Sequence, residues 1–370
     1  MTLRMTRRAL LALPIALSTA CRTRRTFAGI AFVANHDGHA VAAVDLGVFA
    51  VAKQIPLDGA PTAILSSGRR GGVFALTGAN GRIHEIGVSR LAVSRSVTVC
   101  SEAAGAILSS DASVLFVLCN RPAQLVALST STLRPVWTAR LTATPLDAAV
   151  SPDGRWLVVS YGPAGSIERF DLANHRSAGR IPLNAEAGIV AFQSNSEQFL
   201  VANTGERMLN VYESAGGRLV VKLPLALRPE HFCFNADGGQ LFVTGVGSDS
   251  VVIVYPYFTP QIGETILAGR APGAMAATPD LLFAANSHSG DVSILHIESR
   301  KLIAVAPAGS NPSFIAVTPD NQYALVLNSG SGDMGVIWIP GLTRTRARSA
   351  PLFTLIPVGS RPIAATIVPV

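Results

Sequence analysis

Charged side chains are scarce in this sequence. They make up 14% of the 370 residues, and aromatic residues make up only 6%. Because 49% of the residues are apolar, the chain can bury a large core and does not have the composition of a disordered protein. The formal net charge of +7 is spread along the chain, with no basic stripe interleaved with aromatic residues. We therefore expect no nucleic-acid partner.

Short motifs of several enzyme classes are missing. The chain has no Walker A loop, no GxSxG elbow, no HExxH pair and no CxxCH haem-attachment pattern. The Trp-Asp strand ending of WD40 repeats is also missing, since Trp137, Trp156 and Trp338 are not followed by Asp. These absences favour a binding protein over a catalyst and give no reason to expect a cofactor.

Cysteines are few. Cys21 lies at a predicted processing site, which leaves Cys100, Cys119 and Cys233, so at most one disulfide can form. Cys100 ends a fourth strand of one predicted repeat and Cys119 ends a second strand of the next, and such strands are not expected to be neighbours. The sequence therefore predicts buried free thiols.

The N-terminal 20 residues have the pattern of an export signal. Arginines precede residue 9, and residues 9–20 form an apolar run too short to span a bilayer comfortably. Thr6-Arg7-Arg8 resembles the start of a twin-arginine motif, and an ordinary secretory leader is the alternative. We predict a signal peptide over residues 1–20, a tether over 21–28 and an exported protein, periplasmic or on the outer surface.

The end of the leader allows two kinds of cleavage. Leu17-Ser18-Thr19-Ala20-Cys21 resembles a bacterial lipobox, although Ser18 stands where that motif usually has Leu. Ser18 and Ala20 also suit an ordinary signal peptidase, and both enzymes would cut before Cys21. We favour lipidation of Cys21, which would attach the protein to a membrane.

A repeat of about 42 residues is the main signal in the chain. Each repeat starts with a Pro or small residue, followed by four to six apolar-rich residues and a polar turn. Successive starts are separated by 42, 42, 42, 42, 43, 40 and 50 residues, an even spacing that is typical of propeller blades. The starts are Pro61, Ala103, Pro145, Ala187, Pro229, Pro272, Pro312 and Pro362.

Each repeat predicts four strands joined by tight turns. A short first strand ends in a turn such as Ser151-Pro152-Asp153-Gly154, where Pro sets φ and Gly accepts a positive φ. A strongly apolar second strand follows, then a third, and then a more polar fourth strand that suits the rim. The 50-residue repeat carries an insertion around residues 341–350, which we place between its third and fourth strands.

The two ends of the chain are predicted to share one blade. Residues 361–370 match a first strand, whereas residues 29–57 supply a second, third and fourth strand. This arrangement leaves no exposed seam in a closed ring. We predict one all-β domain over residues 29–370, a β-propeller of four-stranded antiparallel blades, with eight blades favoured and seven as the alternative.

The repeat resembles the YVTN family of bacterial β-propellers. The matching elements are the turn Ser151-Pro152-Asp153-Gly154, the second-strand ending Val201-Ala202-Asn203 and the third-strand ending Phe170-Asp171-Leu172. The resemblance covers essentially all of residues 29–370. It implies the propeller fold and an exported or surface location, and it implies little about activity.

Ligands of propellers are expected in the central funnel, and few of the residues there have polar or ionisable side chains that could bind a ligand. Glu230 and His231 lie in one predicted first strand and Asp147 in another, so they are the candidate ligand-binding residues. His36 and His39 are weak metal candidates, because two histidines three apart can share a metal while Asp-Gly between them is ordinary hairpin sequence. The other histidines, at 84, 175, 288 and 296, show no spacing that would gather them.

Recurring polar residues are interpreted as structural. Asn at second-strand ends and an acid at third-strand ends repeat in most blades, whereas a catalytic group need occur only once. We therefore expect an exported binding or scaffold module, a monomer, that takes a protein or small ligand at the funnel. The alternatives are a hydrolase of the lactonase type and an accessory subunit of a periplasmic oxidoreductase.

Overall fold

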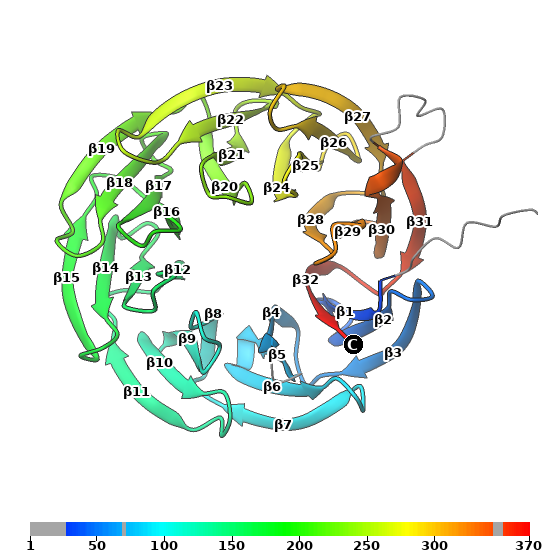
Figure 1. Ribbon diagram of the computed structural model, residues 1–370. Helices are drawn as coiled ribbons and strands as arrows, with labels where there is room; N and C mark the ends of the chain where they lie inside the picture. Colours follow the sequence, from blue (N-terminus) through cyan, green and yellow to red (C-terminus); the bar gives the residue numbers. More distant parts are fainter. Residues whose placement is uncertain (1–26, 69–71, 343–350) are drawn as a thin grey trace, which may run out of the picture.

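The computed structural model is a ring of eight four-stranded antiparallel sheets (Figure 1). It describes residues 27–68, 72–342 and 351–370. Each sheet is one blade, and its strands follow one another from the central hole to the rim. The predicted eight-bladed propeller is confirmed, and the seven-bladed alternative is excluded.

The strands fall where the repeat predicted them. The innermost strands are β4 (Pro61–Ser66), β8 (Glu102–Leu108), β12 (Asp147–Val150), β16 (Ala187–Phe192), β20 (Arg228–Phe234), β24 (Pro272–Ala277), β28 (Pro312–Val317) and β32 (Pro362–Pro369). The second strands are β1 (Gly29–Asn35), β5 (Gly72–Thr77), β9 (Val114–Arg121), β13 (Trp156–Ser160), β17 (Gln198–Asn203), β21 (Leu241–Val246), β25 (Leu281–Asn286) and β29 (Tyr323–Asn328).

The outer half of each blade follows the same order. The third strands are β2 (Ala40–Asp45), β6 (Arg82–Gly87), β10 (Gln124–Ser129), β14 (Ser166–Asp171), β18 (Met208–Glu213), β22 (Ser250–Tyr255), β26 (Asp291–His296) and β30 (Asp333–Trp338). The outermost strands are β3 (Ala50–Pro56), β7 (Ala92–Thr98), β11 (Pro135–Arg140), β15 (Arg176–Pro182), β19 (Leu219–Pro224), β23 (Gln261–Leu267), β27 (Lys301–Pro307) and β31 (Leu352–Pro357). Short 3-10 turns occur at η2 (Gly78–Asn80) and η3 (Ile339–Gly341), and η3 begins the predicted insertion between β30 and β31.

Burial explains why the second strands are apolar throughout instead of alternating. Every residue of β5, β25 and β29 is buried, because each blade packs against a neighbour on both faces. The outermost strands are mostly exposed, and β15 is a representative example. The polar fourth segment of the repeat therefore lies at the rim, as predicted.

The apolar core is divided among the interfaces between blades. The buried apolar residues of the described chain form eight clusters, and each cluster draws on two neighbouring blades. A buried phenylalanine recurs in second strands, and burying each one is worth about 1.5–3 kcal/mol. Examples are Phe32, Phe74, Phe116, Phe199, Phe242 and Phe283. A blade can bury both faces only within a closed ring, so the core and the closure depend on each other.

The ring closes as the two chain ends predict. β32 pairs with β1 in antiparallel register from Gly29–Pro369 to Asn35–Pro362 (Figure 1). The side chain of Asn35 donates to the carbonyl oxygen of Val358 at 2.7 Å, which joins this blade to its neighbour. The asparagine at the end of the second strand therefore has the predicted structural role here.

The prediction of three free thiols is wrong. Cys100 and Cys119 form a disulfide with a Cα–Cα distance of 6.2 Å, and only Cys233 is free in the described chain. Cys100 does not lie within the fourth strand: β7 ends at Thr98, and the next residues lead inward to β8. Because β8 pairs with β9 and Ala103 lies opposite Cys119, this connection passes close to Cys119.

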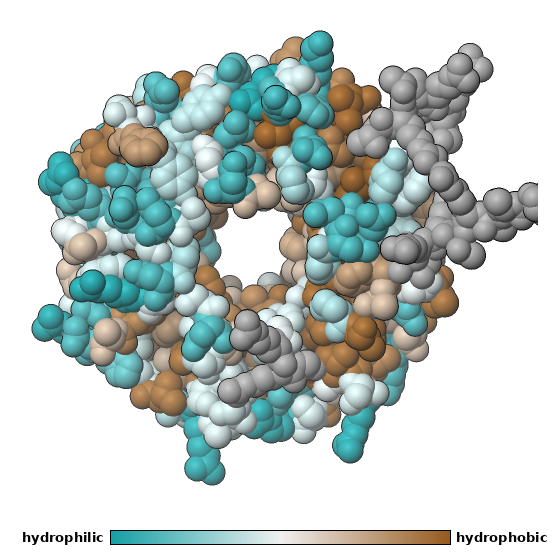
Figure 2. Space-filling view, in the orientation of Figure 1, coloured by the Kyte–Doolittle hydropathy of each residue, from teal (hydrophilic) through white to brown (hydrophobic). Residues whose placement is uncertain are grey.

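The two faces of the ring carry different connections. The innermost strands begin on one face, which also carries the hairpins between second and third strands. We call this the entry face. Turns of the Ser-Pro-Asp-Gly kind lie on the opposite face, because they join the ends of first strands to the starts of second strands. The space-filling view shows an open hole at the centre of the ring (Figure 2).

Candidate functional site

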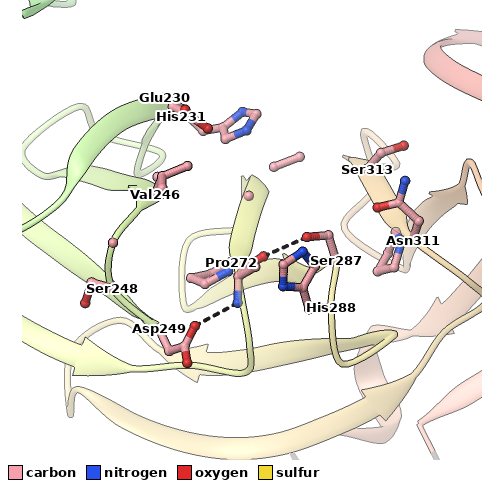
Figure 3. A pocket seen from close by; sticks show the side chains of 16 residues that line it. Glu230, His231, Val246, Ser248, Asp249, Pro272, Ser287, His288, Asn311 and Ser313 are labelled. Atoms are coloured by element: carbon pink, nitrogen blue, oxygen red, sulfur yellow. Dashed lines mark hydrogen bonds between the residues drawn. The ribbon is translucent and has the colours of Figure 1, made fainter. Parts of the chain in front are cut away.

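A pocket of about 590 Å³ lies on the entry face over three consecutive blades. Its lining comes from the starts of β20, β24 and β28 and from the hairpins β21–β22 and β25–β26 (Figure 3). The volume is in the range of small-molecule sites. Among the lining residues are Glu230 and His231, two of the candidates predicted from the sequence.

The His231 imidazole projects from β20 over the start of β24 (Figure 3). Burial lowers the pKa of His231 below its usual 6.5, and the opposing effect of the Glu230 charge is smaller. At neutral pH the ring is therefore uncharged and can donate or accept a hydrogen bond. A Cβ on Gly273 would lie 3.4 Å from Nε2 of His231, so this glycine leaves open space beside the ring.

Glu230 is held only loosely by other charges. Its Oε1 lies 3.9 Å from Nε of Arg228, and the same arginine makes a closer contact of 3.1 Å with Oε2 of Glu186 on the neighbouring blade. Both side chains are well exposed, so these ion pairs contribute little to stability. The Glu230 carboxylate thus remains available to a ligand.

The two hairpins add groups that the sequence analysis did not select. Asp249 accepts a hydrogen bond from the backbone N–H of Ala271 at 2.8 Å, and Ser287 donates to the Ala271 carbonyl oxygen at 3.1 Å (Figure 3). His288 follows on the same hairpin and lies in the lining. The spacing of His288 in the sequence predicts no cluster, yet the fold brings it into the same pocket as His231.

The floor of the pocket is tied together across a blade boundary. Thr244 on β21 donates through Oγ1 to the carbonyl oxygen of Gly273 on β24 at 2.6 Å. Gly245 follows, and a Cβ there would collide with the carbonyl oxygen of Arg228. The close approach of backbones at this point requires glycine and fixes the start of β20.

Asp147 lies apart from this pocket. It is on β12, two blades away, and its Oδ2 accepts the backbone N–H of Val190 on β16 at 2.9 Å. A register shift in the β16–β17 pairing between Ala187 and Val190 accompanies this contact. Burial raises the pKa of Asp147 above its usual value, and the hydrogen bonds oppose this effect only in part. Asp147 thus joins two blades near the hole and does not line the pocket of His231.

The weak metal candidates lie on the entry face of the closing blade, in the β1–β2 hairpin. His36 Nδ1 lies 2.7 Å from Oδ1 of Asp37, and Arg361 approaches the same oxygen at 3.4 Å. His39 has a positive φ of 45° in the turn. Within residues 27–68, 72–342 and 351–370, no three His, Cys, Asp or Glu residues are placed to hold a metal.

A serine–histidine–aspartate chain occurs elsewhere, in the blade of β4–β7. His84 Nδ1 lies 2.9 Å from Oγ of Ser96, and Nε2 lies 3.0 Å from Oδ1 of Asp58. The residue types are those of hydrolase triads, but His84 is only 3% exposed and none of the three lines the pocket. We interpret this hydrogen-bonded arrangement as that of a buried histidine with a structural role.

Two remaining predictions concern membranes and thiols. Cys21, the predicted lipidation site, and the leader lie outside the described residues. In the described part of the chain, no helix has the length and apolar character needed to cross a membrane. Burial raises the pKa of the free Cys233 thiol to about 12, so this thiol is unreactive at neutral pH.

Comparisons with known proteins identify the architecture. No family model matches the chain, and no curated protein matches its sequence. Dihydro-heme d1 dehydrogenase NirN in complex with DHE is similar in structure, with a TM-score of 0.78 and 14% identity over 93% of this chain and 76% of that chain.

Two further structures share the fold. Hydrazine synthase of Kuenenia stuttgartiensis has a TM-score of 0.60 and 17% identity, over 72% of this chain and 92% of that chain. A functionally unknown protein from Desulfotomaculum acetoxidans DSM 771 has a TM-score of 0.61 and 14% identity, over 78% of this chain and 96% of that chain. At such low identities the likenesses show the fold alone: an eight-bladed β-propeller similar to that of NirN.

Proposed function

We propose that this protein is an exported binding module that takes a small ligand in the pocket between His231 and His288. The observation that carries the proposal is the convergence of two imidazoles and two carboxylates, from two neighbouring blades, on one pocket of about 590 Å³. Concave sites with a few convergent polar groups are where small ligands bind. Binding is therefore the function that we assign to the pocket.

Export is part of the proposal. The leader over residues 1–20 and the lipobox-like sequence before Cys21 supply the signal. The disulfide between Cys100 and Cys119 supports it, because disulfides persist in oxidising compartments outside the cytoplasm. We propose a mature protein that begins at Cys21, is attached through a lipid there, works as a monomer, and is related to the YVTN propellers.

The fold likeness to NirN raises haem as a competing ligand. NirN acts, by its name, on dihydro-heme d1. Haem macrocycles carry carboxylates, which proteins commonly pair with arginine or lysine. The pocket lining holds Glu230 and Asp249 but no arginine or lysine that could pair with such carboxylates. A role as accessory subunit of an oxidoreductase therefore rests on the shared fold alone.

The test is ligand binding by residues 22–370, which lack the leader and the proposed lipidation site, purified without added ligands. Isothermal titration with a panel of amines, sugars, organic anions and haemin is compared between the native chain and Gly273→Leu. The leucine would fill the space beside His231, and Gly273 has no positive φ that would strain the substitution. We expect a ligand that the native chain binds and the variant does not. Equal binding by both chains for every ligand would refute the assignment to this pocket.

A further inference from the structure

We infer that the ligand of this pocket is a small organic cation with an ammonium or guanidinium group on a short alkyl chain. The inference rests on the binding function proposed above and adds the chemical class. Among the sixteen lining residues, the ionisable ones are Glu230, His231, Asp249 and His288.

Those four groups give the pocket a negative charge. Glu230 and Asp249 supply two carboxylates, and burial lowers the pKa of His231, which disfavours the charged form of its ring. Arginine and lysine are absent from the lining, although the whole chain has a formal charge of +7. An acidic pocket on a basic protein attracts cations and excludes anions, because the local groups dominate at short range.

Both carboxylates have room for a cation. Asp249 is exposed, and its Oδ1 accepts the Ala271 N–H at 2.8 Å, which fixes the carboxylate at the rim with a second oxygen to offer a ligand. Glu230 has only the 3.9 Å contact with Arg228, whose closer partner is Glu186. An ammonium or guanidinium group would therefore give these oxygens charge-assisted hydrogen bonds that the protein does not provide.

The remaining lining suits a short alkyl chain. Val246, Pro272 and Ala274 supply apolar surface between the polar groups, and Gly273 leaves the space beside the imidazole open. The lining contains no phenylalanine, tyrosine or tryptophan, the large aromatic side chains on which sugars and flat rings stack. A linear amine such as a polyamine matches both the negative charge of the pocket and its apolar lining.

Spermidine is the probe, with agmatine as the guanidinium probe and citrate and glucose as the anionic and neutral ones. Titration calorimetry compares the native chain with Glu230→Gln/Asp249→Asn and with Gly273→Leu. Asp37→Asn, which removes a carboxylate from the same face outside the pocket, is the matched control. Thermal unfolding of each variant verifies that it is folded.

We expect spermidine to bind, the double variant to bind about tenfold more weakly or worse, Gly273→Leu to lose binding, and Asp37→Asn to bind normally. If citrate or glucose binds in a manner that Gly273→Leu abolishes while both amines fail, the cation inference is overturned and the pocket remains the site. If the amines bind all variants equally, both the inference and the proposed pocket are overturned. Failure of all four probes overturns the cation class.

Discussion

The disulfide between Cys100 and Cys119 gives the sharpest prediction, because sequence reasoning predicted free thiols instead. The perturbation is Cys100→Ala/Cys119→Ala, which removes both thiols and leaves Cys233 in place. The bond joins residues 19 apart in sequence. In the loop-entropy account, closing a loop of this length in the unfolded chain contributes about 3 kcal/mol of stability at 25 °C.

That energy converts into a measurable change in Tm. A domain of about 340 residues that unfolds as one unit has an unfolding entropy of roughly 0.7 kcal/mol per kelvin. A loss of about 3 kcal/mol therefore lowers Tm by about 4 °C. Since Cys119 is fully buried and Cys100 is 8% exposed, a reductant should reach the bond only after unfolding.

The assay is thermal unfolding, which gives Tm, and guanidinium unfolding of native and double-variant protein, each with and without reductant, together with a thiol count on unfolded protein. We expect reductant to destabilise the native chain to the level of the variant and to leave the variant unchanged. Envelope protein that is lipidated at Cys21 should show one free thiol, and residues 22–370 made in a reducing cytoplasm should show three. Three thiols in envelope-derived protein, or equal stability of all four samples, would refute the reasoning.

Three further perturbations have signs fixed by the structure. Burial lowers the pKa of His84, and the opposing effect of Asp58 is smaller, so the stability of the fold should decrease as pH falls below about 6.5. In a profile of Tm measured between pH 7.5 and 5, the variant His84→Gln should show a smaller decrease. Burial raises the pKa of Asp147, so its ionised form costs stability at neutral pH. In Asp147→Asn the amide oxygen can still accept the Val190 N–H, so the variant should raise Tm by a few degrees at pH 7.5 and by less at pH 4. Deleting residues 362–370 removes β32 and opens the ring, so the truncated chain should lose cooperative thermal unfolding followed by circular dichroism.

The fold could be predicted because each blade must meet the same local requirements. Asp153 shows why: it accepts hydrogen bonds from Ser151 Oγ and from the N–H of Arg155, and Gly154 takes a φ of 72°. A turn with these demands selects the same residue types wherever it recurs, so the period is visible in the sequence. The strand bounds follow from that period.

The disulfide could not be predicted on the same basis, because it depends on a connection and not on a strand. Thr98 ends β7, and Ser101 N already bonds to the carbonyl oxygen of Arg121 at 3.2 Å at the end of β9. Cys100 therefore lies where the chain crosses from the rim of one blade to the centre of the next. Strand periodicity carries no information about the path of such a crossover.

The pocket was half predictable for a related reason. Glu230 and His231 were found because they lie in a first strand, which faces the hole in any propeller. Asp249 and His288 lie in hairpins of two different blades, and their convergence depends on the angle between those blades. The usable signal was topological: first-strand starts and hairpins after second strands lie on the same face of the ring.

Comparing equivalent positions in the eight repeats distinguishes residues that the fold requires from residues that a binding site would need. The two residues after each of the eight repeat starts occupy equivalent places, and thirteen of these sixteen are not ionisable. The three exceptions are Glu230, His231 and Asp147. Since Ala, Gly, Ile or Phe satisfies the same register in other blades, the fold does not require an ionisable group there. Burial displaces the pKa of both His231 and Asp147 against the charged form, so His231 costs stability at acidic pH and Asp147 costs stability at neutral pH, as an alanine would not. Ionisable residues that the repeat does not require are of the kind that a binding site needs. Two of these three residues, Glu230 and His231, lie together in the pocket.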